Sequence, residues 1–160
     1  MEFKFSEQNL ERIKQEFKKY PVKKPVVMAA LYIAQEQNGY ISNEVIKEVA
    51  NLLEITPEEV LGVVTFYTMY FQKPMGKYHI QVCTNVSCML RGGYEIWKQV
   101  KNELGIDNLE VTDDKLFSLE EVECMGSCGT APMIAVNEDY YENLTPEKVN
   151  EILESLKNQN

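Results

Sequence analysis

Hydrophobic positions in residues 1–72 recur every three or four residues, which is the spacing of amphipathic helices. Ser6 and Ser42 precede such runs as N-caps, and Thr56–Glu59 has the pattern of a capping box. The run Val26–Ala34 is apolar on nearly all sides and predicts a buried helix. The sequence therefore predicts a small helical bundle. Its four helices are expected at residues 6–20, from Pro25 to a stop at Asn38–Gly39, from Ser42 through Leu53, and from Thr56 through Tyr67.

The pattern changes after Gln72–Gly76, which we interpret as a linker. Residues Lys77–Cys83 alternate between apolar and polar positions, as in a half-buried strand. A helix led by Gly92–Gly93 follows, and Thr145–Glu147 begins a last helix. Weaker strands are expected at residues 109–111, 116–123 and 133–137, with a turn at 137–140 before another short strand. This order predicts an α/β domain of thioredoxin-like type over residues 77–160.

Charge and hydropathy narrow the classes of partner. The net charge is −9, which argues against binding nucleic acid or anionic lipid through bulk electrostatics. No run of 18 apolar residues is present, so no membrane insertion is expected. The N-terminus shows no apolar secretion signal, and this predicts a reducing, cytoplasmic compartment in which thiols stay free.

All four cysteines come in two pairs, Cys83 with Cys88 and Cys124 with Cys128. Each pair follows a predicted strand, so adjacent strands would bring both pairs to one end of a sheet. Four converging thiolates are the ligand set of a [2Fe–2S] cluster, a [4Fe–4S] cluster or a structural zinc. Disulfides are disfavoured by the predicted compartment, and the chain lacks the C-x-x-C redox motif. Rieske ligation needs two histidines, and the sequence contains only His79.

Zinc and iron–sulfur are equally compatible with the cysteine spacing. The glycines Gly92–Gly93, Gly126 and Gly129 favour [2Fe–2S], because such loops let backbone N–H groups approach sulfur. Arg91 is a cation beside the ligands that would offset the negative charge of a cluster, or else a solvated surface charge. A zinc-stabilised interaction module remains the alternative.

Other residues receive structural interpretations. His79 is expected to be a strand residue with a satisfied hydrogen bond, and Glu120, Glu121 and Glu123 are expected on solvated faces. There is no G-x-G-x-x-G motif and no P-loop, so no nucleotide-binding site is expected in this chain. The aromatic run Phe66, Tyr67, Tyr70 and Phe71 is interpreted as bundle core, with a partner-binding surface as the alternative.

The second cysteine pair carries a family resemblance. Asp114–Ser118 followed by Cys124–Pro132 closely resembles the signature of the complex I 24 kDa subunit family, to which the E subunit of the bacterial NADH–quinone oxidoreductase belongs. The same domain occurs in NAD-linked hydrogenases and formate dehydrogenases. Gly62–Tyr67 and Pro74–Cys83 are also similar to the family, and the likeness extends over residues 20–150. Met125 stands where the family often has Leu.

The resemblance implies a thioredoxin-like [2Fe–2S] ferredoxin domain after an N-terminal helical bundle. It implies Cys83, Cys88, Cys124 and Cys128 as the cluster ligands. The partner it implies is a flavoprotein subunit that binds NADH and FMN and exchanges single electrons with the cluster, off the main line of clusters that leads to quinone. The expected location is cytoplasmic, peripheral to the inner membrane as part of a membrane-bound complex.

Overall fold

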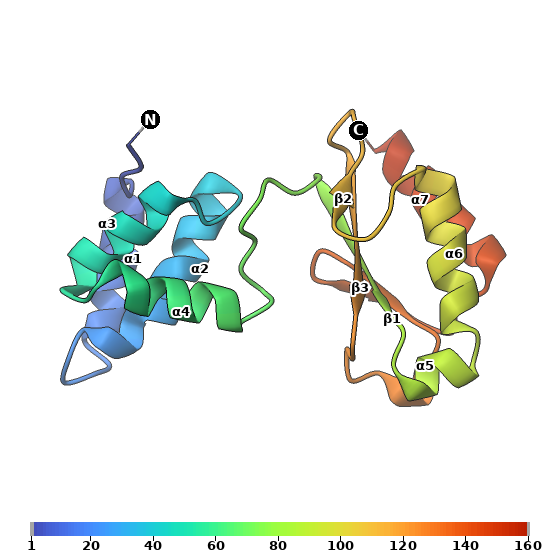
Figure 1. Ribbon diagram of the computed structural model, residues 1–160, viewed down its shortest axis with the longest axis horizontal. Coiled ribbons are helices and arrows are strands. Elements are labelled where there is room, and N and C mark those ends of the chain that lie inside the picture. Colours follow the sequence, from blue (N-terminus) through green and yellow to red (C-terminus); the bar gives the residue numbers. More distant parts are fainter. Residues whose placement is uncertain (1, 160) are drawn as a thin grey trace. The chain divides into compact units, whose positions relative to one another are not determined.

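The computed structural model describes residues 2–159 and divides them into two compact units, the first ending at Pro74 and the second beginning at Met75 (Figure 1). Each unit has its own hydrophobic core. None of the helices within residues 2–159 combines the length and the apolar character that crossing a membrane requires.

The first unit consists of helices. They are α1 (Glu7–Phe17), the 3-10 turn η1 (Lys24–Val26), α2 (Val27–Asn38), α3 (Asn43–Leu53) and α4 (Pro57–Phe66). The predicted caps are confirmed: Ser6 and Ser42 accept hydrogen bonds from backbone N–H groups, and Thr56 and Glu59 form the complete capping box. Helix α1 ends three residues earlier than predicted, because Lys18 and Lys19 bond to carbonyls three residues back, which tightens the last turn.

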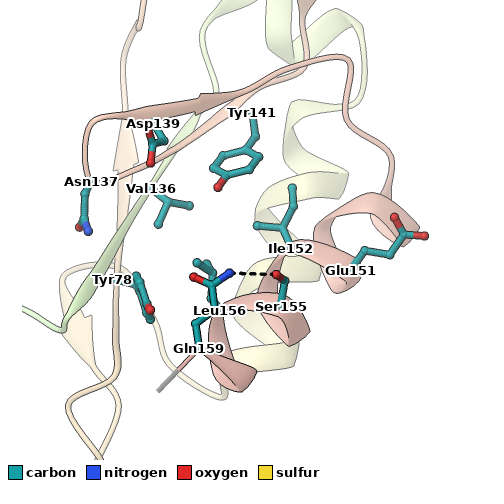
Figure 2. A pocket seen from close by; sticks show the side chains of 10 residues that line it. All are labelled: Tyr78, Val136, Asn137, Asp139, Tyr141, Glu151, Ile152, Ser155, Leu156 and Gln159. Carbon is teal, nitrogen blue, oxygen red and sulfur yellow. Dashed lines mark hydrogen bonds between the residues drawn. The ribbon is translucent and has the colours of Figure 1, made fainter.

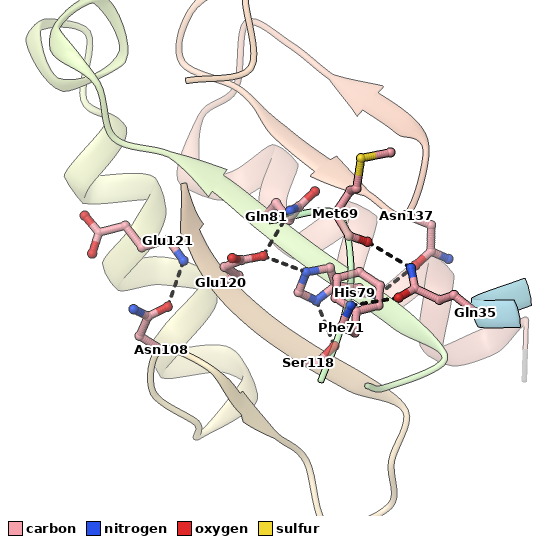
Figure 3. Close-up of polar contacts among 10 residues, drawn as sticks. All are labelled: Gln35, Met69, Phe71, His79, Gln81, Asn108, Ser118, Glu120, Glu121 and Asn137. Carbon is pink, nitrogen blue, oxygen red and sulfur yellow. Dashed lines mark hydrogen bonds and ion pairs between the residues drawn. The ribbon is translucent and has the colours of Figure 1, made fainter. Parts of the chain in front are cut away.

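The chain after α4 is held against α2 by polar contacts. The side chain of Gln35 donates to the carbonyl of Met69 (2.9 Å) and accepts from the backbone N–H of Phe71 (2.7 Å) (Figure 3). Between these two bonds, Tyr70 is buried and its hydroxyl donates to the carbonyl of Met28. The interpretation of the aromatic run as core is therefore correct for Tyr70. It is wrong for Phe66, whose side chain is 77% exposed at the end of α4.

The second unit is a five-stranded sheet covered on one face by helices α6 and α7, which lie side by side (Figure 1). The strand order is β2-β3-β1-β4-β5, in which β1 and β3 are parallel and the other pairs antiparallel. The elements are β1 (Tyr78–Cys83), α5 (Val86–Leu90), α6 (Gly93–Leu104), β2 (Glu110–Val111), β3 (Phe117–Val122), η2 (Cys128–Thr130), β4 (Ile134–Val136), β5 (Asp139–Tyr141) and α7 (Pro146–Asn158).

The helix-covered core of this unit is built from alternate strand positions. Ile80 and Val82 of β1 and Leu119 of β3 are fully buried among apolar residues of the covering helices, such as Ile96 and Leu153. Strand β1 was predicted to be half-buried, but His79 and Cys83 of its other face are buried as well. The reason is side-chain packing on that face: His79 lies against Ser118 and Glu120 of β3, and Cys83 packs with Ala131 and Met133.

Helix α5 was not predicted. Asn85 caps it, accepting a hydrogen bond from the backbone N–H of Val86 (2.6 Å). Five residues are too few to show a helical period in the sequence. This short helix matters because it contains Cys88 and begins three residues after Cys83.

Candidate metal centre

The parallel pairing of β1 and β3 determines where the cysteines lie. Cys83 ends β1 in register with Val122, the last residue of β3, so both strands deliver the chain to the same end of the sheet. Cys124 follows β3 by two residues, and Cys128 begins η2. All four predicted ligands consequently line one pocket of about 100 Å³. The other residues lining it are Asn85, Val86, Ser87, Gly126 and Ser127.

The two pairs differ in burial. Cys83 and Cys88 are buried and pack with Ala131 and Met133, whereas Cys124 and Cys128 are exposed. Burial, together with the neighbouring Cys83 thiol, raises the pKa of Cys88 to about 11. A free thiolate is thus disfavoured at Cys88. A metal ion bound to the sulfur would be needed to stabilise the thiolate form.

The donor set fits a soft metal. All four sulfurs are free thiols, and thiolates select zinc or iron–sulfur clusters over hard cations. Within residues 2–159, no three potential ligand side chains lie close enough together to hold a single metal ion. What the four cysteines share is the lining of one pocket.

One backbone N–H is directed at a ligand sulfur. Gly126 donates to Sγ of Cys124 at 3.4 Å, and its φ of +80° lies in the left-handed region that favours glycine. This bond confirms for Gly126 the prediction, made from the glycines of the loops, that N–H groups approach sulfur.

Comparison with known proteins determines the family. Residues 13–157 match the sequence profile of the thioredoxin-like [2Fe-2S] ferredoxin family. The chain belongs to this family. The E subunit of NADH-quinone oxidoreductase from Rickettsia bellii is 46% identical over 98% of this chain and 95% of its own length. NADH-quinone oxidoreductase subunit 2 of Thermus thermophilus is 43% identical over 91% of this chain and 82% of its own.

A solved structure supports the fold. The NAD+-reducing [NiFe]-hydrogenase in the H2-reduced state has a chain that superposes with a TM-score of 0.74 at 20% identity. The match covers 85% of the ferredoxin and 23% of that chain. The resemblance predicted from the sequence is thus confirmed, and the cofactor that the family implies is a [2Fe–2S] cluster.

Another glycine shapes the first cysteine loop of the ferredoxin. A Cβ on Gly93 would lie 2.8 Å from the carbonyl carbon of Cys88 and 3.1 Å from the carbonyl oxygen of Cys83. The start of α6 can therefore lie against the backbone of both cysteines only because residue 93 has no side chain. This close approach puts the positive end of the α6 dipole beside the first pair.

The face of the sheet opposite α6 and α7 contains a polar network that the sequence predicts only in part. His79 is satisfied as predicted: its Nδ1 lies 2.9 Å from Oγ of Ser118 and its Nε2 lies 3.0 Å from Oε2 of Glu120 (Figure 3). Glu120 was expected on a solvated face, which is wrong, because it is partly buried and also accepts from Gln81. Burial raises the pKa of Glu120, but the bonds from His79 and Gln81 outweigh this and lower it below its usual value.

A second hollow, of about 320 Å³, lies between the β4–β5 hairpin and α7 (Figure 2). Tyr78 and Tyr141 form part of its wall, and Asp139 and Glu151 contribute carboxylates. None of its described lining residues is basic or a cysteine, so it offers no complement to a phosphate group and no thiolate to a metal.

Proposed function

We propose that this ferredoxin is the electron-transfer subunit of an NADH–quinone oxidoreductase. The observation that carries the proposal is the single pocket lined by four thiols from two strand ends, in a chain that aligns over nearly its full length with a subunit of that complex. The ligands we propose are Cys83, Cys88, Cys124 and Cys128. When bound, a [2Fe–2S] cluster supplies one-electron redox chemistry.

The uneven burial of the cysteines indicates the side from which a redox partner can approach the site. Cys83 and Cys88 would hold the cluster from the buried side and exclude water there. Cys124 and Cys128 lie on the exposed side, where a redox partner can approach. We propose that this partner is a flavoprotein subunit that holds NADH and FMN, because neither pocket of the ferredoxin described above suits a dinucleotide.

The remaining proposals concern organisation. We propose that residues 1–72 and 77–160 form separate domains, which the separate cores of the two units support. We also propose a cytoplasmic location, peripheral to the inner membrane and maintained by partner subunits, which the net charge of −9 supports because it disfavours direct contact with anionic lipid.

The first test is metal analysis of the full-length ferredoxin purified without air. We expect equal amounts of iron and sulfide, two of each per chain, as the family's cluster requires. Changing any one of the four cysteines to Ser should lose or strongly perturb the cluster. Zinc in place of iron would overturn the proposal, and an unaltered EPR spectrum in one variant would remove that cysteine from the ligand set.

The second test separates electron transfer from NADH oxidation. A hydride carries two electrons, whereas the cluster accepts one, so a flavin has to divide the pair. We expect dithionite to bleach the visible spectrum of the isolated, flavin-free ferredoxin, and NADH to do so only after the flavoprotein is added. Prompt bleaching by NADH alone would show that the ferredoxin has a hydride site of its own.

A further inference from the structure

Arg91 connects the two cysteine loops. It follows α5 directly, three residues after Cys88. Its guanidinium Nη1 donates to the carbonyl of Gly129 at 3.3 Å and to the carbonyl of Ala131 at 3.4 Å. Gly129 is the neighbour of Cys128, so the side chain from the first loop reaches the backbone that carries the last cysteine.

We infer that Arg91 is a positioning residue that clamps the second cysteine loop to the first and whose charge favours the reduced state of the cluster. The inference rests on the proposed function and adds to it a residue that is not a ligand. It has two parts, one from hydrogen-bond geometry and one from charge, and each can be tested separately.

The geometric part depends on the shape of the side chain. Both acceptors are backbone carbonyls on either side of Thr130, so the clamp holds the course of the chain after Cys128 rather than one side chain. A guanidinium presents several N–H groups in a rigid plane, whereas a lysine ammonium is a single point on a flexible stem. Lysine at position 91 would therefore keep the charge but hold the loop less firmly.

The charge part depends on what Arg91 faces. Within residues 2–159, no carboxylate forms an ion pair with Arg91, unlike Arg12, which pairs with Glu36. Its positive charge thus lies beside the second cysteine loop, where one carboxylate, that of Glu142, accepts hydrogen bonds from Ser127 and Thr130 but does not pair with Arg91. A [2Fe–2S] core with four thiolates is a dianion that becomes a trianion on reduction, so a nearby cation stabilises the reduced form more. Removing the cation should lower the reduction potential.

The experiment compares three variants of the full-length ferredoxin, Arg91→Gln, Arg91→Lys and Lys98→Gln. Lys98 is an exposed cation of α6, so Lys98→Gln is the matched control that changes the net charge equally. The readouts are the midpoint potential from an EPR-monitored titration and the rate at which a chelator removes iron. Neither depends on activity of the complex.

We expect Arg91→Gln to have a lower potential than the wild type and to lose iron roughly fivefold to tenfold faster, as expected for two lost hydrogen bonds. Arg91→Lys should recover the potential but still lose iron faster, and Lys98→Gln should match the wild type in both. If Arg91→Gln fails to retain a cluster while Lys98→Gln retains it, the clamp is supported. The charge part is then tested on Arg91→His, whose potential should fall relative to the wild type as the pH rises through the usual imidazole pKa of about 6.5; an unchanged difference would overturn it.

Two results would overturn the inference. Arg91→Gln could match Lys98→Gln in potential and in iron loss, or Arg91→Lys could lose iron no faster than the wild type. A wild-type protein that contains zinc or no cluster would instead contradict the proposed function, so the two failures are distinguishable.

Discussion

At Gly93 the molecule has no room for a methyl group, because an added Cβ would press on the backbone of Cys88 at 2.8 Å. We expect Gly93→Ala to displace the first cysteine loop, to reduce the iron content per chain, and to destabilise the fold by roughly 1–3 kcal/mol, the usual cost of overpacking. Iron analysis and thermal unfolding of the purified variant measure the two effects.

Gly129 provides the matched control. It lies beside Cys128, no atom is within 4 Å of the position that its Cβ would take, and its φ is not positive. Gly129→Ala should therefore keep the iron content and stability of the wild type. An equal loss of iron in both variants would mean that the close approach at Gly93 has no special role.

The sequence predicts that the cysteines follow strand ends and that Arg91 and the nearby glycines lie beside them, but not which backbone groups these residues contact. Cys83 and Cys124 stand out because metal ligands are few and regularly spaced. The roles of Arg91 and Gly93 depend on backbone that comes from the other loop or from α5, and a helix of five residues leaves no periodic signal. The sequence indicated the charge of Arg91 and the glycines beside it, but not these contacts.

At the scale of the elements, side-chain contacts join β1 and β3 in addition to the backbone hydrogen bonds of the sheet. The buried His79 of β1 lies against Ser118 and Glu120 of β3, whose carboxyl pKa is lowered. This contact was missed because it depends on the register of the two strands, which pairs His79 with Ser118. The sequence showed only three glutamates before a cysteine, a pattern typical of a solvated face.

The lowered pKa of Glu120 gives a pH dependence with a definite sign. The ionised carboxylate is favoured in the folded state, so its contribution is complete above the pKa of an unfolded glutamate, about 4.3, and is lost as the pH falls through the folded-state value. We expect Glu120→Gln to lower the free energy of unfolding at pH 7 by about 1 kcal/mol and by less as the pH falls below 4.

Denaturant unfolding of the wild type and the variant at each pH measures this difference, and any loss of cluster common to both cancels. Glu123→Gln is the control, because Glu123 is exposed on the same segment. A constant difference between the wild type and Glu120→Gln from pH 7 to about 3 would contradict the assignment of the ionised state to Glu120.

On the scale of the whole molecule, the helical unit exposes apolar side chains near the end of α4 that take no part in the cysteine site. Phe66 at the end of α4 is 77% exposed, and its ring packs edge to face at 5.0 Å on that of Tyr67, which is itself 38% exposed. Single exposed apolar residues are common, but two exposed aromatic rings packed together are typical of an interaction site. We expect this surface to bind the flavoprotein.

The test is Phe66→Ser, which should weaken binding of the full-length ferredoxin to the flavoprotein by about tenfold while the cluster spectrum stays unchanged. Val22→Ser is the control, because Val22 is 61% exposed in the connection between α1 and η1. A shortened chain that begins at Lys77 should show the same weakening. If the shortened chain bound the flavoprotein with undiminished affinity, neither Phe66 nor the rest of the N-terminal domain would contribute to that binding.

The parallel pairing of β1 with β3 has a consequence for biosynthesis. During translation Cys83 and Cys88 leave the ribosome well before Cys124 and Cys128. Strand β3, which brings the second pair alongside the first, is synthesised just before the second pair. A nascent chain that ends before residue 124 offers two thiols and half a site. With these four cysteines as the proposed ligands, we expect cluster insertion to follow synthesis and sheet closure, and a ribosome-stalled chain ending at residue 120 to accept no cluster from a donor.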